Sequence, residues 1–198
     1  HAGVCYGVER ALDMVRDAMD GDEDVFTIGP LIHNPRVVTQ LKDHGVESIE
    51  GPADVDHGIV VLRTHGVEPS VVEELDERGL SSIDATCPHV SRAQKAAADF
   101  AAQGMTVLVI GRASHPEVRG ICAHAAGSAV VVADASEIPA DIAGPVGIVV
   151  QTTENKSKLD EVVADLRGRG IEPVVKNTIC SATRKRQDAA ADLADKVD

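Results

Sequence analysis

Aromatic side chains are scarce in this chain of 198 residues: they make up 2% of the sequence, with one Tyr, two Phe and no Trp. Proteins that bind single-stranded nucleic acids stack the bases on aromatic rings, so this composition argues against that class. A net charge of -13 argues against duplex DNA and anionic membranes, because both attract clusters of Lys and Arg. We therefore expect no nucleic-acid partner and no membrane partner.

Long apolar runs and closely spaced cysteines are also absent. No stretch of 18 apolar residues and no signal-peptide pattern occurs. The four cysteines are 82, 35 and 58 residues apart, which is too sparse for a small disulfide-stabilised secreted domain. We expect reduced thiols and a cytoplasmic protein. No Gly-x-Gly-x-x-Gly or Walker loop follows an expected strand, so a nucleotide-binding protein is disfavoured.

The strongest pattern in the sequence is an internal repeat. The motif Cys-x-x-Val-x-Arg-Ala begins at Cys5 and again at Cys87. Each copy is followed by an apolar stretch and by Ile-Gly-x-x-x-His, and the His lies 28 residues after the Cys in both copies (His33 and His115). Two motifs that share one spacing indicate a duplicated structural unit.

A third copy of the cysteine motif begins at Cys180, and its matching His would fall beyond the last residue. The sequence also lacks an initiator Met and ends within an amphipathic segment, so we expect it to be part of a longer protein. The repeat predicts a first domain at 1–87, a second domain at 88–177 and the start of a truncated third domain at 178–198.

Short apolar stretches alternate with amphipathic stretches through both full repeats, as is typical of strand-helix-strand units with parallel strands. This pattern predicts an α/β fold of small repeated domains, each with a mainly parallel four-stranded sheet. Strands are expected at 25–28, 59–62, 80–83, 106–110, 129–132, 146–150 and 174–175, and helices at about 6–21, 35–45, 90–103, 159–166 and 183–197 and directly after Pro69 and Pro116.

Polar residues of interest follow the expected strands. His33, His65 and His115 lie at strand-to-helix junctions, the edge of a parallel sheet where ligands bind. Imidazole rings beside helix N-termini suit an anion such as a diphosphate. Each His alone is more often a loop hydrogen-bonder than a ligand, but three at equivalent positions favour the anion site. Glu117 could relay protons or act as a first-turn helix acid. Thr152 or Thr153 could donate a hydroxyl to a substrate oxygen or cap the following helix.

Three cysteines occupy the same position of the repeat, each before an expected helix, where the helix dipole favours a thiolate. Cys5, Cys87 and Cys180 could hold three corners of a 4Fe-4S cluster with the fourth iron open, or a zinc ion together with a His. The alternative is that each is a small buried apolar residue. Cys122 has no repeat partner, and we expect it to pack within a helix.

Together, the repeated motifs and the segments around them resemble one known family, the hydroxymethylbutenyl diphosphate reductases. The resemblance runs in order through nearly the whole chain. It rests on Gly3-Val4-Cys5-Tyr6-Gly7-Val8, Leu31-Ile32-His33-Asn34, Thr64-His65-Gly66-Val67, Asp84-Ala85-Thr86-Cys87-Pro88, His115-Pro116-Glu117-Val118, Gln151-Thr152-Thr153 and Thr178-Ile179-Cys180.

The resemblance implies an oxidoreductase of the methylerythritol phosphate route to isoprenoids. Its three α/β domains would surround a central 4Fe-4S cluster. The reaction would be the reductive dehydration of an allylic diphosphate, 4-hydroxy-3-methylbut-2-enyl diphosphate, to isopentenyl and dimethylallyl diphosphate. Electrons would come from a donor protein such as ferredoxin or flavodoxin.

The resemblance also implies a role for each candidate residue. The cysteines would hold the cluster, the histidines would bind the diphosphate, and an acid and a hydroxyl would relay the proton to the leaving group, with the hydroxyl also touching substrate. These residues are Cys5, Cys87 and Cys180 for the cluster, His33, His65, His115 and Thr152 for the substrate, and Glu117 and Thr152 for the proton.

The family's third domain contributes a Ser-x-Asn segment and a further Ser to the diphosphate site, and neither falls within these 198 residues. We therefore expect the 198 residues alone to have little reductase activity. The alternative to the reductase is a non-catalytic α/β module in which zinc or a cluster has a structural role only.

Overall fold

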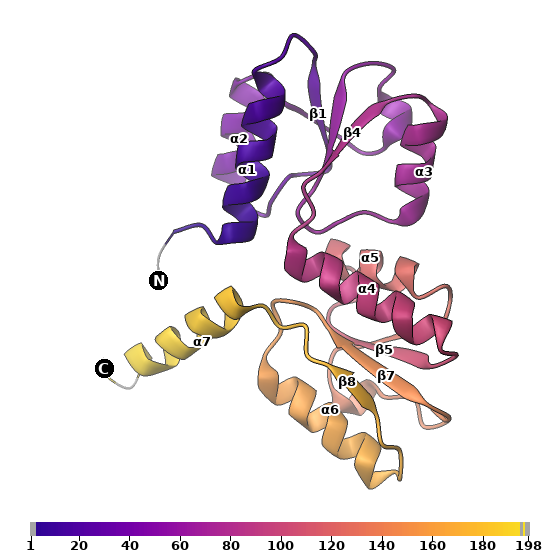
Figure 1. Cartoon of the computed structure of the whole chain (residues 1–198). Coiled ribbons are helices and arrows are strands. Elements are labelled where there is room, and N and C mark those ends of the chain that lie inside the picture. The colour runs from indigo at the N-terminus through magenta and orange to yellow at the C-terminus, as the bar shows by residue number, and fades with distance from the viewer. Residues whose placement is uncertain (1–2, 195, 197–198) are drawn as a thin grey trace. The chain divides into compact units, whose positions relative to one another are not determined.

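A computed structural model describes residues 3–194 and 196 of the chain (Figure 1). The chain forms two compact units, Val4–Pro88 and His89–Asp198 together with His1–Gly3, here called the N-terminal and C-terminal units. Each contains one four-stranded sheet. Within the described residues, no helix combines the length and the apolar character that a membrane crossing requires.

The N-terminal unit alternates helices and strands. Its sheet has the strand order β2-β1-β3-β4, and all pairs are parallel. The elements are α1 (Tyr6–Met19), β1 (Val25–Ile28), α2 (Pro35–Asp43), β2 (Glu47–Ile49), the short helix η1 (Pro52–Asp54), β3 (Ile59–Leu62), α3 (Pro69–Glu77) and β4 (Ser81–Asp84).

The C-terminal unit repeats this plan. Its strand order β6-β5-β7-β8 is that of the first sheet, and its pairs are also parallel. The predicted α/β fold with parallel four-stranded sheets is confirmed. The elements are α4 (Pro88–Ala102), β5 (Thr106–Ile110), α5 (Pro116–His124), β6 (Ala129–Val132), η2 (Ala135–Glu137), β7 (Val146–Val150), α6 (Lys156–Gly168), β8 (Val174–Lys176) and α7 (Ser181–Ala194).

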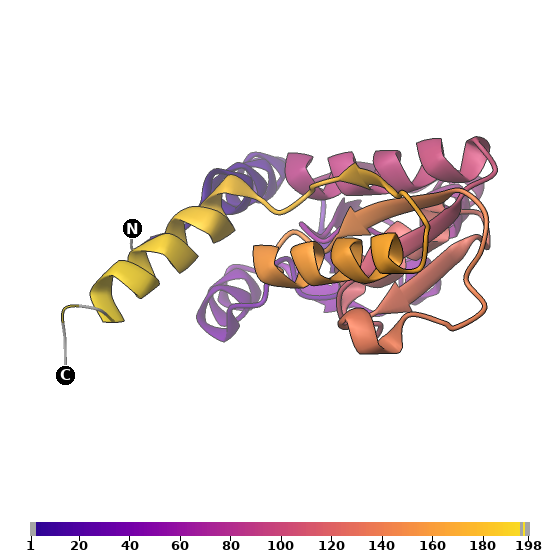
Figure 2. The ribbon, with the colours of Figure 1, turned by 90° about the horizontal axis from the view of Figure 1, so that it is seen from below.

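Helices cover both faces of each sheet. In the C-terminal unit, Val107 and Val109 of β5 pack with α4 and α5, whereas Leu108 and Ile110 pack with α6. Successive strand residues point to opposite faces, so a strand covered on both sides must be apolar at every position. Figure 2 shows α4 and α6 on opposite sides of the sheet. The N-terminal unit has the same layers, with α1 and α2 on one face and α3 on the other.

Four of the described α-helices begin at a proline: α2 at Pro35, α3 at Pro69, α4 at Pro88 and α5 at Pro116. The sequence predicts these starts for α2, α3 and α5. Proline suits the first helical position because its fixed φ matches the helix and the missing N-H is not needed there. Strand β2 was not expected, because Glu47–Ile49 is short and mostly exposed. The end of the helix expected at 183–197 includes residues 195 and 197, which lie outside the described residues.

Candidate active site

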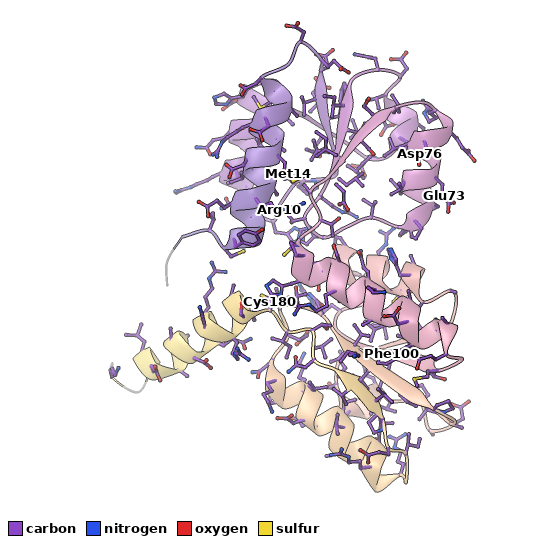
Figure 3. The ribbon with its side chains drawn as sticks, in the orientation of Figure 1. Arg10, Met14, Glu73, Asp76, Phe100 and Cys180 are labelled. Atoms are coloured by element: carbon purple, nitrogen blue, oxygen red, sulfur yellow. The ribbon has the colours of Figure 1, made fainter. Side chains whose placement is uncertain are left out.

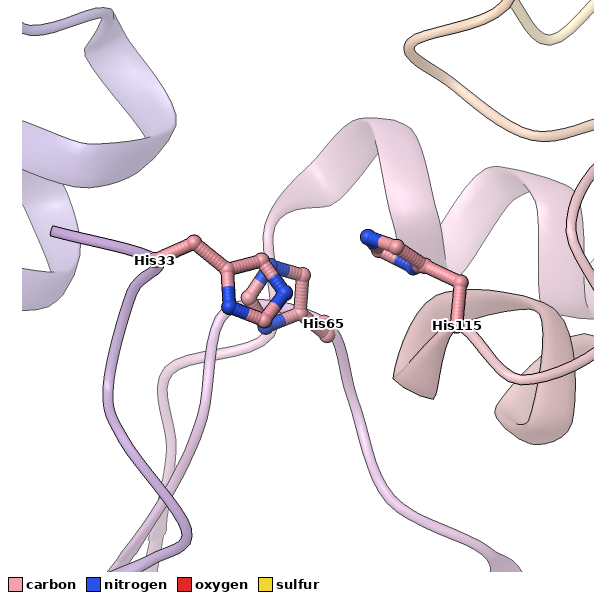
Figure 4. A group of neighbouring side chains, drawn as sticks. All are labelled: His33, His65 and His115. Carbon is pink, nitrogen blue, oxygen red and sulfur yellow. The ribbon is translucent and has the colours of Figure 1, made fainter.

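The strand order creates one switch point in each sheet. The chain leaves β1 for β2 on one side and reaches β3 on the other, and ligands bind beside the carboxyl ends of strands at such a point. His33 follows β1 and His65 follows β3. Their ring centroids are 4.2 Å apart, with planes inclined by 35° (Figure 4). The structure thus brings together the two histidines of the N-terminal unit that the sequence predicts for the diphosphate, His33 and His65.

His115 of the C-terminal unit is the N-cap of α5. Its Nδ1 accepts a hydrogen bond of 3.2 Å from the backbone N-H of Glu117. A nitrogen that accepts cannot carry the proton, so this bond assigns the neutral tautomer with hydrogen on Nε2. The ring therefore acts as the helix cap through one nitrogen and presents an N-H donor through the other.

Glu117 is buried, with 1% of its surface exposed. Its Oε1 accepts from the backbone N-H of Thr152 at 2.6 Å, and its Oε2 accepts from the Thr152 hydroxyl at 2.9 Å. Burial raises the pKa of the Glu117 carboxyl, and the two bonds from Thr152 oppose that rise. A carboxyl whose pKa is raised holds its proton closer to neutral pH, as a general acid requires.

The series of hydrogen bonds from Glu117 to Thr152 continues to Cys180. The carbonyl of Thr152 accepts the backbone N-H of Cys180 at 2.9 Å. The Sγ of Cys180 accepts the N-H of Thr183 at 3.2 Å and lies 3.0 Å from its hydroxyl. Cys180 lies directly before α7, as Figure 3 shows. A metal-bound cysteine sulfur can accept hydrogen bonds of this kind, so this sulfur has the surroundings of a metal ligand.

These hydrogen bonds also recur in the N-terminal unit, but one acceptor differs. The N-H of Cys87 donates to the Thr64 carbonyl at 2.9 Å, as the N-H of the third repeat's cysteine does to Thr152. The N-H and hydroxyl of Thr64 both donate to the backbone carbonyl of Leu31. The matching groups of Thr152 donate to the Glu117 carboxylate. The C-terminal unit therefore has a titratable carboxyl where the N-terminal unit has a peptide carbonyl.

The two cysteines of the N-terminal unit lie at helix starts. Cys5 is the N-cap of α1, and Cys87 directly precedes α4. A β-carbon built on Gly7 would lie 2.5 Å from the Cys87 Sγ, so that sulfur lies against the first turn of α1. None of the four cysteines forms a disulfide. Cys122 packs against the core of the C-terminal unit, and burial raises the pKa of its thiol.

Gln151 joins two loops of the C-terminal unit, a role that the sequence analysis did not assign to it. Gln151 is 2% exposed; its Oε1 accepts from the Arg112 N-H at 3.1 Å, and its Nε2 donates to the Thr153 hydroxyl at 3.0 Å. It thus joins the loop that leads to α5 with the loop after β7. A β-carbon on Gly111 would lie 2.7 Å from its Oε1. The repeat offers the signal, because Arg63 and Gly29 occupy the equivalent positions.

Comparison with protein families gives a match over the whole chain. A family model described as LytB protein matches residues 1–198. Among curated proteins, the 4-hydroxy-3-methylbut-2-enyl diphosphate reductase of Trichlorobacter lovleyi is 41% identical over 198 residues, covering 100% of this chain and 71% of that protein.

Solved structures agree with this match. The structure of (E)-4-hydroxy-3-methyl-but-2-enyl diphosphate reductase, the terminal enzyme of the non-mevalonate pathway, superposes with a TM-score of 0.86 at 37% identity, over 100% of this chain and 72% of that one. The E-1-hydroxy-2-methyl-but-2-enyl-4-diphosphate reductase of Plasmodium falciparum superposes with a TM-score of 0.89 at 27% identity, over 98% of this chain and 63% of that one.

Proposed function

The chain belongs to the LytB protein family, and from this premise we propose that it reduces 4-hydroxy-3-methylbut-2-enyl diphosphate to isopentenyl and dimethylallyl diphosphate in isoprenoid biosynthesis. The observation that carries the proposal is the hydrogen-bonded series from Glu117 through Thr152 to Cys180. It links a buried acid and a hydroxyl to the backbone of a candidate metal ligand, as a reaction that removes a hydroxyl group requires.

A 4-iron, 4-sulfur cluster held by Cys5, Cys87 and Cys180 fits the donor set of the chain. All three are thiols outside any disulfide, and each directly precedes a helix. Thiolates are the ligands that such clusters take, and three of them leave one iron for substrate. When bound, the cluster would pass on the donor's two electrons one at a time and would offer a Lewis-acidic iron to the substrate oxygen.

The diphosphate is held, in this proposal, by His33, His65 and His115. The first two rings lie close together at the switch point of their sheet. The third has its Nε2-H fixed as a donor by the helix cap that Nδ1 makes. Neutral imidazole N-H groups bind phosphate oxygens by hydrogen bonds and do not depend on protonation of the ring.

The proton for the departing hydroxyl comes from Glu117 through Thr152. The carboxyl is buried, which favours its protonated form, and the Thr152 hydroxyl is the group that it touches. Thr152 also contacts the substrate hydroxyl in this scheme. A hydroxyl can accept a proton on one lone pair as it donates its own, so the residue relays a proton without changing charge.

The domain division follows the repeat: 1–87 and 88–177 form two α/β domains, and 178–198 begins a third. Electrons reach the cluster from a small protein such as ferredoxin or flavodoxin. The reaction takes place in the cytoplasm, whose reducing conditions keep such thiols free.

The test starts with protein purified without oxygen. About four iron and four sulfide per chain, with broad visible absorption that bleaches on reduction, supports the cluster. One zinc per chain without visible absorption supports a structural metal site and contradicts the reductase. The full gene product, supplied with a chemical reductant and the allylic diphosphate, is expected to release both five-carbon diphosphates; a loaded cluster without turnover would refute the reaction.

A further inference from the structure

In the loop that presents Cys87, residues 85–87, every backbone N-H donates a hydrogen bond. The N-H of Ala85 donates to the end of β3, that of Thr86 donates to Asp84 Oδ1 at 2.8 Å, and that of Cys87 donates to Thr64. Buried or half-buried backbone groups need partners on the acceptor side as well. The carbonyl of the buried Thr86 therefore also needs a donor, and that of the exposed Asp84 can accept one.

Arg10 of α1 supplies those donors. Its two terminal nitrogens donate to the carbonyl of Thr86 at 3.2 Å and to the carbonyl of Asp84 at 3.4 Å. The side chain is half-buried and extends from the second turn of α1, in the view of Figure 3, toward the end of the sheet. One guanidinium thus spans two alternate carbonyls of the loop, a geometry that its planar fork of donors allows.

The same loop meets α1 one turn earlier. Gly7, three residues before Arg10, leaves the space in which the Cys87 sulfur lies. We propose that Arg10 is a positioning residue for Cys87: by bonding to the carbonyls of Asp84 and Thr86, it holds the Cys87 sulfur against the helix turn that begins at Cys5. Both cysteines of this unit are then fixed to one helix.

The third cysteine of the repeat offers a comparison. Thr183, three residues after Cys180, holds that sulfur through its N-H and contacts it through its hydroxyl. At the equivalent place after Cys87 stands Val90, which has no hydroxyl. Arg92, the equivalent of Arg10 in the second repeat, is exposed, and its side chain makes no hydrogen bond within the described part of the chain. Arg92 therefore does not bond to the loop of Cys180 as Arg10 bonds to the loop of Cys87.

The consequence for a bound cluster rests on the proposed function. A metal ligand whose loop is free must be ordered when the metal binds, and loss of a group that orients a ligand weakens metal sites by about 10-fold to 100-fold. Removal of Arg10 is expected to speed the loss of iron to a chelator by that order. The loop itself is expected to loosen in the absence of any cluster.

The experiment compares Arg10→Met, which keeps the aliphatic stem, with Arg10→Lys, which keeps the charge but cannot span both carbonyls. Arg16→Met is the matched control, because Arg16 lies on the same helix, is exposed, and bonds only Asp13 within the described residues. Amide hydrogen exchange is measured on each apoprotein for two peptides, the Cys87 loop and strand β3. Iron loss to a chelator is then measured on each reconstituted protein.

In Arg10→Met, exchange at Thr86 and Cys87 is expected to rise about 10-fold or more while β3 stays protected, and iron loss is expected to quicken. Arg10→Lys is expected to behave similarly, and Arg16→Met like wild type. Equal loosening of the loop and β3 would mean a general structural role and overturn the proposal, as would an unchanged loop. If wild-type protein binds no cluster, the proposed function fails, and the exchange data still decide the role of Arg10.

Discussion

A β-carbon placed on Gly7 would lie 2.5 Å from the Sγ of Cys87, although the two residues are 80 positions apart in the sequence. Real β-carbons do not approach another atom so closely, so any larger residue at position 7 would force the Cys87 sulfur to move. A glycine inside a helix costs about 1 kcal/mol relative to alanine. At residue 7 the need for space near a thiol outweighs the helical preference.

Gly7→Ala should therefore separate stability from metal binding. The alanine favours α1 by up to about 1 kcal/mol, while its methyl group displaces the Cys87 sulfur. We expect a melting temperature near that of wild type and a strongly reduced iron content. Gly21→Ala is the control, because a β-carbon there would meet only an ordinary contact of 3.5 Å. A Gly7→Ala protein with full iron content would show that the sulfur does not need this position.

Serine substitutions test the ligand set. Replacing Cys5, Cys87 or Cys180 should each abolish or severely reduce cluster assembly, because a hydroxyl is a poor ligand for the cluster iron. Cys122→Ser should keep the cluster, since that thiol packs against the core beneath α5. Iron, sulfide and visible absorption report the outcome. Loss of the cluster from the Cys122 variant alone would reverse the assignment.

Gln151→Leu tests the connection between the two loops of the C-terminal unit. Leucine leaves the N-H of Arg112 and the hydroxyl of Thr153 without the bonds that Gln151 makes. Arg112 and Thr153 are exposed residues, so each lost hydrogen bond should cost about 0.5 to 1.5 kcal/mol, and the free energy of unfolding in urea should fall by about 1 to 3 kcal/mol for the two bonds. Gln103→Leu is the control on an exposed helix end, where surface changes stay within about 0.5 kcal/mol.

Periodicity and repeat spacing predict the parallel sheets because both depend on local pattern. The segment from Val107 to Ile110 is apolar at every position because helices cover both faces of β5. Such a run can be recognised in the sequence. Strand β2 lies at a sheet edge and is mostly exposed, so its sequence contains no apolar run that would predict it. Only the fold could reveal that Gly7 makes room for a distant sulfur.

The candidate site, like the fold, could be predicted only in part from the sequence. The repeat singles out His115 and Cys180, because a shared spacing marks equivalent positions. It does not indicate that the His115 ring caps α5, or that Glu117 is buried and bonded twice to Thr152. Those facts depend on how the β5 and β7 loops pack together. Sequence therefore predicts the residue types, while their protonation and hydrogen bonding require the folded unit.

Glu117→Gln tests the proposed acid. The amide keeps an acceptor for the Thr152 N-H and can donate to the Thr152 hydroxyl, so the fold and the cluster should persist. It cannot release a proton, and general acid catalysis contributes about 100-fold to 10,000-fold in rate. We expect turnover of the full gene product to fall by that order with iron content unchanged. Glu172→Gln, which alters an exposed ion pair with Arg167, should leave the rate intact.

The same variant should change how stability depends on pH. Burial raises the pKa of Glu117 above its ordinary value of 4.5, so between that value and the folded pKa the native chain binds more protons than the unfolded chain. The free energy of unfolding must then decrease as pH rises through this window, because the carboxyl ionises in a buried place. Glu117→Gln removes that decrease. Urea denaturation of both proteins from pH 4.5 upward measures it, and parallel curves would show that Glu117 ionises as readily in the folded chain as in the unfolded one.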